Sequence, residues 1–173
     1  MATVTLITGG ARSGKSAYAI ARATQNHGAR RFFVATAQAL DDEMLTRIAH
    51  HRANRPEHFQ TLEEPLNVAA ALAGLEGRAD VAVLDCLTLW VSNLMAIYTT
   101  DAAVLAEADS LAKVLREASF ASVIVTDEVG AGIVPDNPLA RRFRDLLGWS
   151  NQKVAKAADE VILMVAGQPL RVK

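Results

Sequence analysis

The chain has 173 residues, of which 51% are hydrophobic and 21% charged, and its formal net charge is −1. This length suits a single domain with a substantial core, so we expect residues 1–173 to form one domain. The net charge is close to zero, so the chain lacks the strongly basic character by which proteins attract nucleic acid or an anionic membrane. Cys86 is the only cysteine, which excludes an intramolecular disulfide and favours the reducing cytoplasm.

The first segment predicts a strand, a glycine-rich loop and a helix. Residues 3–8 (TVTLIT) form a short β-branched run, and residues 16–25 (SAYAIARATQ) are rich in alanine, which favours helix. No basic stretch with a long apolar run precedes the strand, and nowhere do about 18 apolar residues follow one another. We therefore predict neither an export signal nor a membrane span.

Further short apolar runs follow, at residues 31–36, 58–63, 81–85, 122–126 and 160–166. Helix-favouring stretches separate them, and the glycines within residues 73–80 suit a turn from helix to strand. This alternation predicts an α/β fold with a mostly parallel sheet and helices on both faces. Ligands of such sheets bind at the carboxyl ends of the strands.

The sequence GGARSGKS, residues 9–16, matches the pattern G-x-x-x-x-G-K-[ST] of a phosphate-binding P-loop. In such a loop, backbone N–H groups surround phosphate oxygens, Lys15 reaches the β- and γ-phosphates, and Ser16 ligates Mg²⁺. Arg12 either adds charge to this site or faces solvent. We predict nucleotide contacts from Gly9, Gly10, Ala11, Arg12, Ser13, Gly14, Lys15 and Ser16. The alternative is a glycine-rich turn that only caps a helix.

Acidic residues follow two later apolar runs. Asp85 ends the run VAVLD and is predicted to hold Mg²⁺ as a Walker B aspartate, although it could instead cap the next helix. Asp127 and Glu128 follow the run that ends at residue 126. Either could bind metal or accept a substrate proton, or the pair could simply start a loop in which Gly130 and Gly132 make turns.

Two adjacent histidines lie in DDEMLTRIAHHRAN, residues 41–54, a predicted helix with acidic residues at its start. At about 100° per residue, His50 points to the polar side and His51 lies at the edge of an apolar stripe. Helix geometry alone favours a solvated His50 and a packing role for His51. His27 and His58 add no spacing typical of a metal cluster. The stripe, expected to face the core, consists of Met44, Leu45, Ile48 and Ala49.

Several stretches resemble one protein family, in the same order along the chain: TGGARSGKS, ATAQALDDEM, RIAHHRANRP, LDCLTLWVSNL and the stretch that begins TDEVGAGIVPDN. That family is the bifunctional adenosylcobinamide kinase and adenosylcobinamide-phosphate guanylyltransferase of cobalamin biosynthesis. The P-loop alone is not specific, but its combination with DDEM…RI.HH…RP and EVG.GIVP is.

The resemblance implies a RecA-like P-loop fold, two successive reactions and, commonly, a homotrimer. ATP or GTP first phosphorylates the aminopropanol hydroxyl of adenosylcobinamide. GTP then guanylylates an enzyme histidine with loss of pyrophosphate, and adenosylcobinamide phosphate takes the GMP to give adenosyl-GDP-cobinamide. The family's guanylylated histidine matches His50. A histidine with the ordinary pKa of about 6.5 is mostly neutral at pH 7 and can attack the α-phosphorus, while Lys15 and Mg²⁺ stabilise the leaving pyrophosphate.

The resemblance also implies nucleotide contacts from two further segments: Ala35, Thr36 and Ala37 at a strand end, and His51, Arg52, Ala53, Asn54 and Glu63 on the guanine or ribose side. Alternatively, the Thr36 hydroxyl makes a backbone bond and Glu63 is a solvated acid. In this chain Asp85 replaces a glutamate found in some relatives, and Asp127 stands where an asparagine often occurs.

Two other functions remain open from the sequence. A small-molecule or nucleotide kinase without guanylyl transfer would explain the P-loop and Asp85, with Arg141, Arg142 and Arg144 as a phosphate-binding lid. A solvated helix face explains these arginines better. An NTP-driven switch would also use a P-loop, but no N-K-x-D motif follows a strand, since NQKV at 151–154 lies in a predicted helix.

Overall fold

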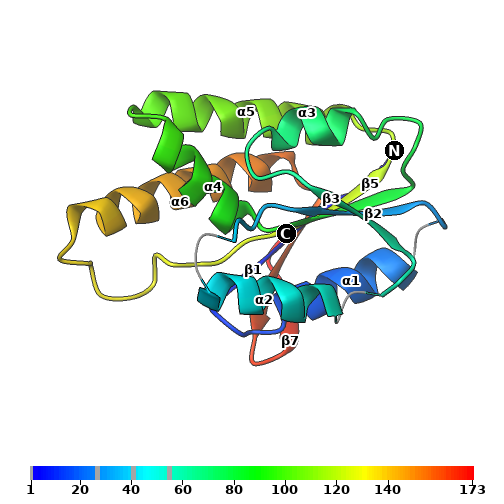
Figure 1. Ribbon diagram of the computed structural model, residues 1–173, viewed down its shortest axis with the longest axis horizontal. Coiled ribbons are helices and arrows are strands. Elements are labelled where there is room, and N and C mark those ends of the chain that lie inside the picture. The colour runs from blue at the N-terminus through cyan, green and yellow to red at the C-terminus, as the bar shows by residue number, and fades with distance from the viewer. Residues whose placement is uncertain (1, 26–27, 40–41, 54–55) are drawn as a thin grey trace.

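The computed structural model describes residues 2–25, 28–39, 42–53 and 56–173. A seven-stranded sheet with the order β3-β2-β4-β5-β1-β6-β7 forms its centre, with helices on both sides (Figure 1). The neighbouring strands pair in parallel from β3 to β6, and β7 pairs antiparallel with β6. The predicted α/β class with a mostly parallel sheet is confirmed. No helix within the described residues is both long and apolar enough to cross a bilayer.

Six of the seven strands coincide closely with the apolar runs of the sequence. The strands are β1 (Val4–Gly9), β2 (Arg31–Ala35), β3 (Phe59–Glu63), β4 (Val81–Asp85), β5 (Ala121–Val125), β6 (Glu160–Val165) and β7 (Gln168–Arg171). The seventh strand, β7, was not predicted because its residues are all exposed and show no apolar pattern. Ala166 and Gly167 join it to β6 with φ angles of 48° and 81°, the left-handed backbone that a two-residue hairpin turn needs.

The helices form two unequal layers. They are α1 (Lys15–Gln25), α2 (Asp42–Ala53), α3 (Val68–Ala73), α4 (Leu87–Ile97), α5 (Asp101–Glu117) and α6 (Pro138–Ala157). Figure 1 shows α3 to α6 on one side of the sheet and α1 and α2 on the other. The segment 151–154 lies within α6, as predicted.

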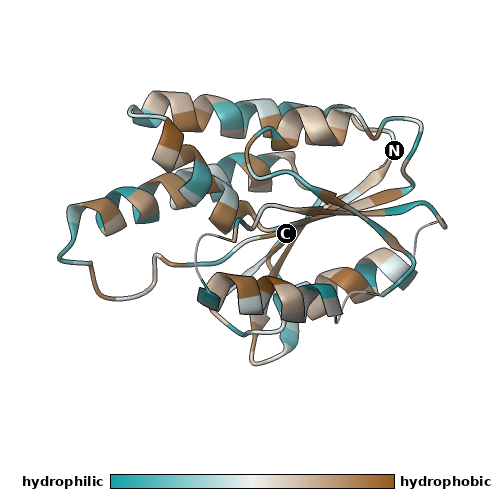
Figure 2. Ribbon diagram, in the orientation of Figure 1, coloured by the Kyte–Doolittle hydropathy of each residue, from teal (hydrophilic) through white to brown (hydrophobic). Residues whose placement is uncertain are grey.

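Each central strand buries side chains on both faces, which is why the strands read as continuous apolar runs (Figure 2). On β1, Leu6 packs in the cluster under α3 to α6, and its neighbour Ile7 packs in the cluster under α1. Ala19 and Ala23 of α1 are fully buried in the second cluster. Their small side chains let α1 lie close to the sheet, which fixes the loop that precedes this helix.

The predicted core-facing stripe of α2 is wrong. Leu45 is 52% exposed, Ala49 is exposed, and Met44 and Ile48 are only half-buried. No α2 side chain that the structure describes is buried, and the side chains of Glu43, Arg47, His50, His51 and Ala53 lie outside the description. The helical period predicted the element correctly, but none of the described side chains of this helix is buried against the sheet.

Candidate active site

The carboxyl ends of five neighbouring strands meet along one edge of the sheet. Glu63 lies opposite Ala35, Ala35 lies opposite Asp85, and Asp85 lies opposite Val125. Val125 in turn lies opposite Ile7, two residues before the P-loop begins. Four predicted site segments therefore share the edge at which parallel sheets bind ligands.

The P-loop has a backbone that its glycines make possible. Gly9 has a φ of 147° and Gly14 a φ of 95°, both in the range that favours glycine. A Cβ atom on Gly9 would lie 2.5 Å from the carbonyl oxygen of Met164, so glycine lets β1 end against β6. On the other side of the loop, the Gly167 N–H donates to the Ser13 carbonyl over 3.0 Å. Packing and hydrogen bonds therefore set the loop's shape. Ala11 and Arg12 are exposed.

Lys15 is largely buried, at 8% exposure, and begins α1. Its Nζ donates to the carbonyl oxygen of Gly10 over 2.6 Å and lies 2.7 Å from Oδ1 of Asp127. The P-loop cation is thus paired with the acid at the end of β5. The sequence placed Asp127 at this edge but did not predict this partner.

The backbone of Asp127 is held by side chains from two helices. Its N–H donates to Oγ1 of Thr88 over 2.7 Å, and its carbonyl accepts from Nδ2 of Asn151 over 3.2 Å. Thr126 is fully buried and donates to Oδ1 of Asn151 over 2.7 Å. Thr88 belongs to α4 and Asn151 to α6, so both helices fix where β5 ends.

Sequence reasoning missed this network of Thr88, Thr126 and Asn151. One signal was present: Asn151 lies four residues after Leu147 and three before Val154, both fully buried. A polar residue on the buried stripe of a helix needs a hydrogen-bond partner. The identity of that partner depends on the packing of α6 against β5, which no local pattern reveals.

Thr36 is fully buried and connects the ends of β2 and β4. Its Oγ1 donates to the Cys86 carbonyl over 2.8 Å and accepts from the Cys86 N–H over 2.9 Å. The sequence left open whether this hydroxyl contacts the nucleotide or bonds to the backbone, and the structure shows it bonded to the backbone. Burial raises the pKa of the Cys86 thiol to about 12, and the negative charge of Asp85 adds to the shift. Cys86 therefore stays protonated and is a poor nucleophile.

The backbones of His50 and His51 lie in α2, as predicted, but the structure does not describe where their side chains point. Asn54 and His27 lie outside the described residues. Arg52 forms an ion pair with Glu63, which links the end of α2 to the end of β3. The two side chains border a cavity of about 370 Å³, lined by Arg52, Pro56, Glu57, Phe59, Thr61 and Glu63. Two residues predicted on the guanine or ribose side are thus neighbours.

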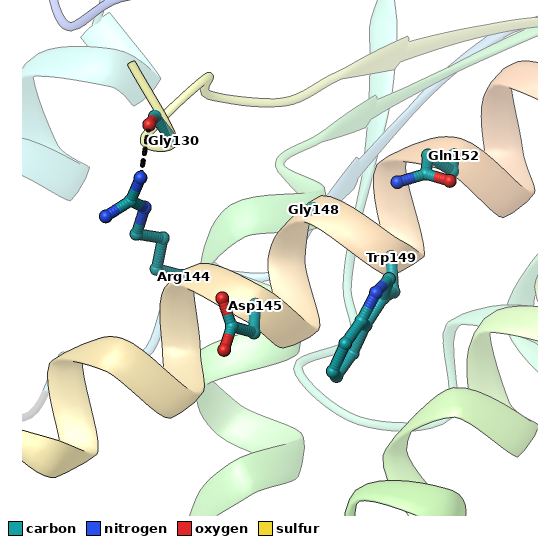
Figure 3. A pocket seen from close by; sticks show the side chains of 6 residues that line it. All are labelled: Gly130, Arg144, Asp145, Gly148, Trp149 and Gln152. Carbon is teal, nitrogen blue, oxygen red and sulfur yellow. Dashed lines mark hydrogen bonds between the residues drawn. The ribbon is translucent and has the colours of Figure 1, made fainter. Parts of the chain in front are cut away.

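The arginines of α6 are bonded to the protein itself. Arg142 donates to Oδ1 of Asp101 over 2.7 Å, and Arg144 donates to the carbonyl of Gly130 over 2.7 Å (Figure 3). Arg141 donates to the carbonyl of Asp136 over 2.7 Å. The predicted solvated face is confirmed only for Arg141, which is exposed, because Arg142 and Arg144 are half-buried. The bonds of all three arginines also oppose a phosphate-binding lid. Arg144 borders a smaller cavity of about 210 Å³, lined by Gly130, Arg144, Asp145, Gly148, Trp149 and Gln152 (Figure 3).

The oxygen donors at this edge fit Mg²⁺. Hydroxyl and carboxylate oxygens are the hard ligands that this ion prefers, and Ser16 and Asp85 supply them. Within the described part of the chain, no three His, Cys, Asp or Glu residues could hold a metal on their own. An ion here would complete its shell with phosphate oxygens and water, as Mg²⁺ usually does.

A mostly parallel sheet with a P-loop between its first strand, β1, and the first helix, α1, defines a P-loop nucleotide-binding protein. The fold is similar to that of the RadB recombinase in its crystal structure, with a TM-score of 0.54 and 16% sequence identity. The match covers 93% of this chain and 73% of the RadB chain. The predicted RecA-like fold is confirmed.

The sequence narrows this class. The profile of the cobinamide kinase / cobinamide phosphate guanyltransferase family matches residues 5–172. The bifunctional adenosylcobalamin biosynthesis protein CobU of Escherichia coli strain K12 is 41% identical over 180 residues, which cover 97% of this chain and 98% of the relative. The corresponding protein CobP of Pseudomonas aeruginosa is 42% identical over 168 residues, covering 97% and 96%. The chain belongs to this family of bifunctional enzymes.

Proposed function

We propose that residues 1–173 form one domain that carries two reactions at the P-loop edge. It phosphorylates the aminopropanol hydroxyl of adenosylcobinamide with ATP or GTP, and then transfers GMP from GTP to adenosylcobinamide phosphate. One observation carries the proposal: the edge that presents Lys15 also anchors the end of the histidine-bearing helix, through the pair of Arg52 and Glu63. The product is adenosyl-GDP-cobinamide.

In the kinase step, the loop of residues 9–16 holds the phosphates through its backbone N–H groups. Lys15 then contacts the β- and γ-phosphates. Ser16 and Asp85 would hold Mg²⁺, which when bound would supply charge neutralisation at the phosphate oxygens. The cobinamide hydroxyl attacks the γ-phosphorus, the bond from this phosphorus to the oxygen that bridges it to the β-phosphate breaks, and the hydroxyl proton passes to solvent water.

In the guanylyl step, a ring nitrogen of His50 attacks the α-phosphorus of GTP. A phosphorus–nitrogen bond forms and the bond to pyrophosphate breaks, with Lys15 stabilising the leaving charge. A phosphate oxygen of the cobinamide then attacks the same phosphorus. The phosphorus–nitrogen bond breaks, which returns His50 to its original form.

The second reaction requires α2 to approach the P-loop. Little apolar burial opposes such a displacement, because no described side chain of α2 is buried. In this arrangement we expect the strand end and the end of α2 to line the nucleotide, with the following residues: Ala35, Thr36, Ala37, His51, Arg52, Ala53, Asn54 and Glu63. Thr36 would contribute through its backbone, since its hydroxyl is bonded to Cys86.

Incubation with α-labelled GTP tests the covalent intermediate. We expect acid-labile, base-stable label on the wild-type chain, loss of label in His50→Ala, and retention in the matched neighbour His51→Ala. His50→Ala should keep the kinase activity. Label that survives in His50→Ala would contradict this assignment, and kinase activity with no label on the wild type would indicate a kinase without guanylyl transfer.

We also propose a homotrimer located in the cytoplasm, where both nucleotides are available. The loop between β5 and α6 presents apolar side chains to solvent, with Ile133 at 97% and Val134 at 59% exposure. Surfaces of this kind favour association. Sedimentation equilibrium should give about three times the chain mass of 18.5 kDa. A mass of one chain would contradict the trimer.

A further inference from the structure

Asp127 forms an ion pair with the amino group of Lys15, the group that a nucleotide phosphate would contact. An ammonium group has three N–H donors. On Lys15, one donates to the Gly10 carbonyl over 2.6 Å, and the carboxylate of Asp127 lies 2.7 Å away. Because Lys15 is only 8% exposed, water competes little for these contacts. An incoming phosphate must therefore compete with Asp127 for the lysine.

The protein itself places this carboxylate. Thr88 accepts the Asp127 N–H and Asn151 donates to the Asp127 carbonyl, so α4 and α6 fix the backbone from both sides. Thr126 connects the two, since it donates to Asn151 and its Oγ1 lies 3.4 Å from that of Thr88. Part-buried hydrogen bonds within the protein thus hold the backbone of Asp127 next to Lys15.

We propose that the carboxylate of Asp127 pairs with Lys15 in place of a nucleotide phosphate. Thr88 and Asn151 are positioning residues that keep Asp127 next to Lys15. The inference rests on the proposed nucleotide site at the P-loop. Its consequence is that Asp127 weakens the binding of anionic nucleotides and promotes the release of phosphate products. A site that serves two successive nucleotide reactions has to empty between them, and a built-in carboxylate favours the empty state.

The decisive variant is Asp127→Asn, which keeps a hydrogen-bond acceptor of the same shape but removes the charge. Calorimetry with GTP in EDTA should show binding about three- to tenfold tighter than in the wild type, because a charge-assisted contact no longer competes. Pyrophosphate should also leave more slowly. The matched control is Asp109→Asn, whose partner Lys153 lies 2.6 Å away between α5 and α6. This control should not change GTP affinity.

A second pair of variants keeps the charge of Asp127. Thr88→Val has nearly the same shape but cannot accept the Asp127 N–H, and we expect it to tighten GTP binding in the same direction by a smaller factor. Thr88→Ser keeps the hydroxyl and should bind GTP like the wild type. Since every chain in this pair carries Asp127, an altered long-range field cannot explain a difference between them.

The outcomes separate the inference from the function on which it rests. If the wild type binds GTP and Asp127→Asn binds metal-free GTP no more tightly, the inference is wrong. If Asp127→Asn weakens binding only when Mg²⁺ is present, Asp127 is a metal-site residue, which also overturns the inference. If the wild type binds GTP no better than Lys15→Ala, the proposed nucleotide site itself fails.

Discussion

Two connections between a strand and a helix lie at the same edge of the sheet and are built differently. Between β1 and α1, glycine geometry, the buried Lys15 and the buried Ala19 fix the chain. After β2, the helix α2 has no described side chain that is buried. Packing of its own residues therefore fixes the P-loop segment, whereas no described side chain of the helix that carries His50 is buried in a core. Under the proposed function, the first connection would bind the phosphates and the second would carry GMP on His50.

The largest expected effect comes from the first connection, at Gly9. Gly9→Ala adds a Cβ 2.5 Å from the Met164 carbonyl at a φ of 147°, so we expect a loss of roughly 3 kcal/mol or more in the free energy of unfolding. Urea denaturation measures this loss, and GTP binding should disappear with it. Gly10→Ala is the control, because its Cβ meets no atom within 4 Å. Equal stability of the two variants would show that the loop is not held by packing.

A matched pair of alanines tests the contrast between α1 and α2 directly. Ala19→Leu forces three more carbons into a fully buried position and should cost about 1–3 kcal/mol of unfolding free energy. Ala49→Leu, on the exposed side of α2, should change it by less than about 0.5 kcal/mol. Denaturation midpoints of both variants provide the measurement. A similar cost at both sites would mean that α2 packs as tightly as α1.

Alkaline pH tests the burial at the end of β4. The pKa of the Cys86 thiol is about 12 in the folded chain, above its ordinary value of 9.0. Below pH 9.0 both states keep the proton. At higher pH only the folded state keeps it, so the free energy of unfolding falls by up to about 1.4 kcal/mol per pH unit. Urea denaturation between about pH 8 and 11 should show a steeper fall for the wild type than for Cys86→Ala. Parallel slopes would contradict the buried, protonated thiol.

The smallest effect is expected for the pair that anchors α2. Arg52 and Glu63 are each 55% exposed, and pairs of this kind stabilise by only about 0.5 kcal/mol. A double-mutant cycle of Arg52→Ala and Glu63→Ala, followed by thermal denaturation, should give a coupling energy of that order. A coupling several times larger would show that α2 is fixed to the sheet after all.

The sequence predicted those features that a short stretch determines by itself. Six strands were found because buried parallel strands are continuous apolar runs, and the P-loop was found because its glycines and lysine lie within the short stretch of residues 9–16. The pairing of Lys15 with Asp127 could not be predicted, since it joins two residues through the order of β1 and β5 in the sheet. The hydrogen bonds of Asn151 depend likewise on how α6 packs. The prediction that the apolar stripe of α2 faces the core was wrong, because a helical period shows which face is apolar but not whether another element covers that face.

The edge of the sheet beyond β6 has one further consequence, for self-association. An open edge strand offers a row of backbone donors and acceptors on which another copy can extend the sheet. In β7 this row is interrupted, because Pro169 has no N–H group to donate. Arg171, two residues further along β7, adds a charged side chain that is 67% exposed, a second feature that discourages strand addition. Two of the four residues that the apolar pattern failed to reveal thus discourage aggregation through this edge of the sheet.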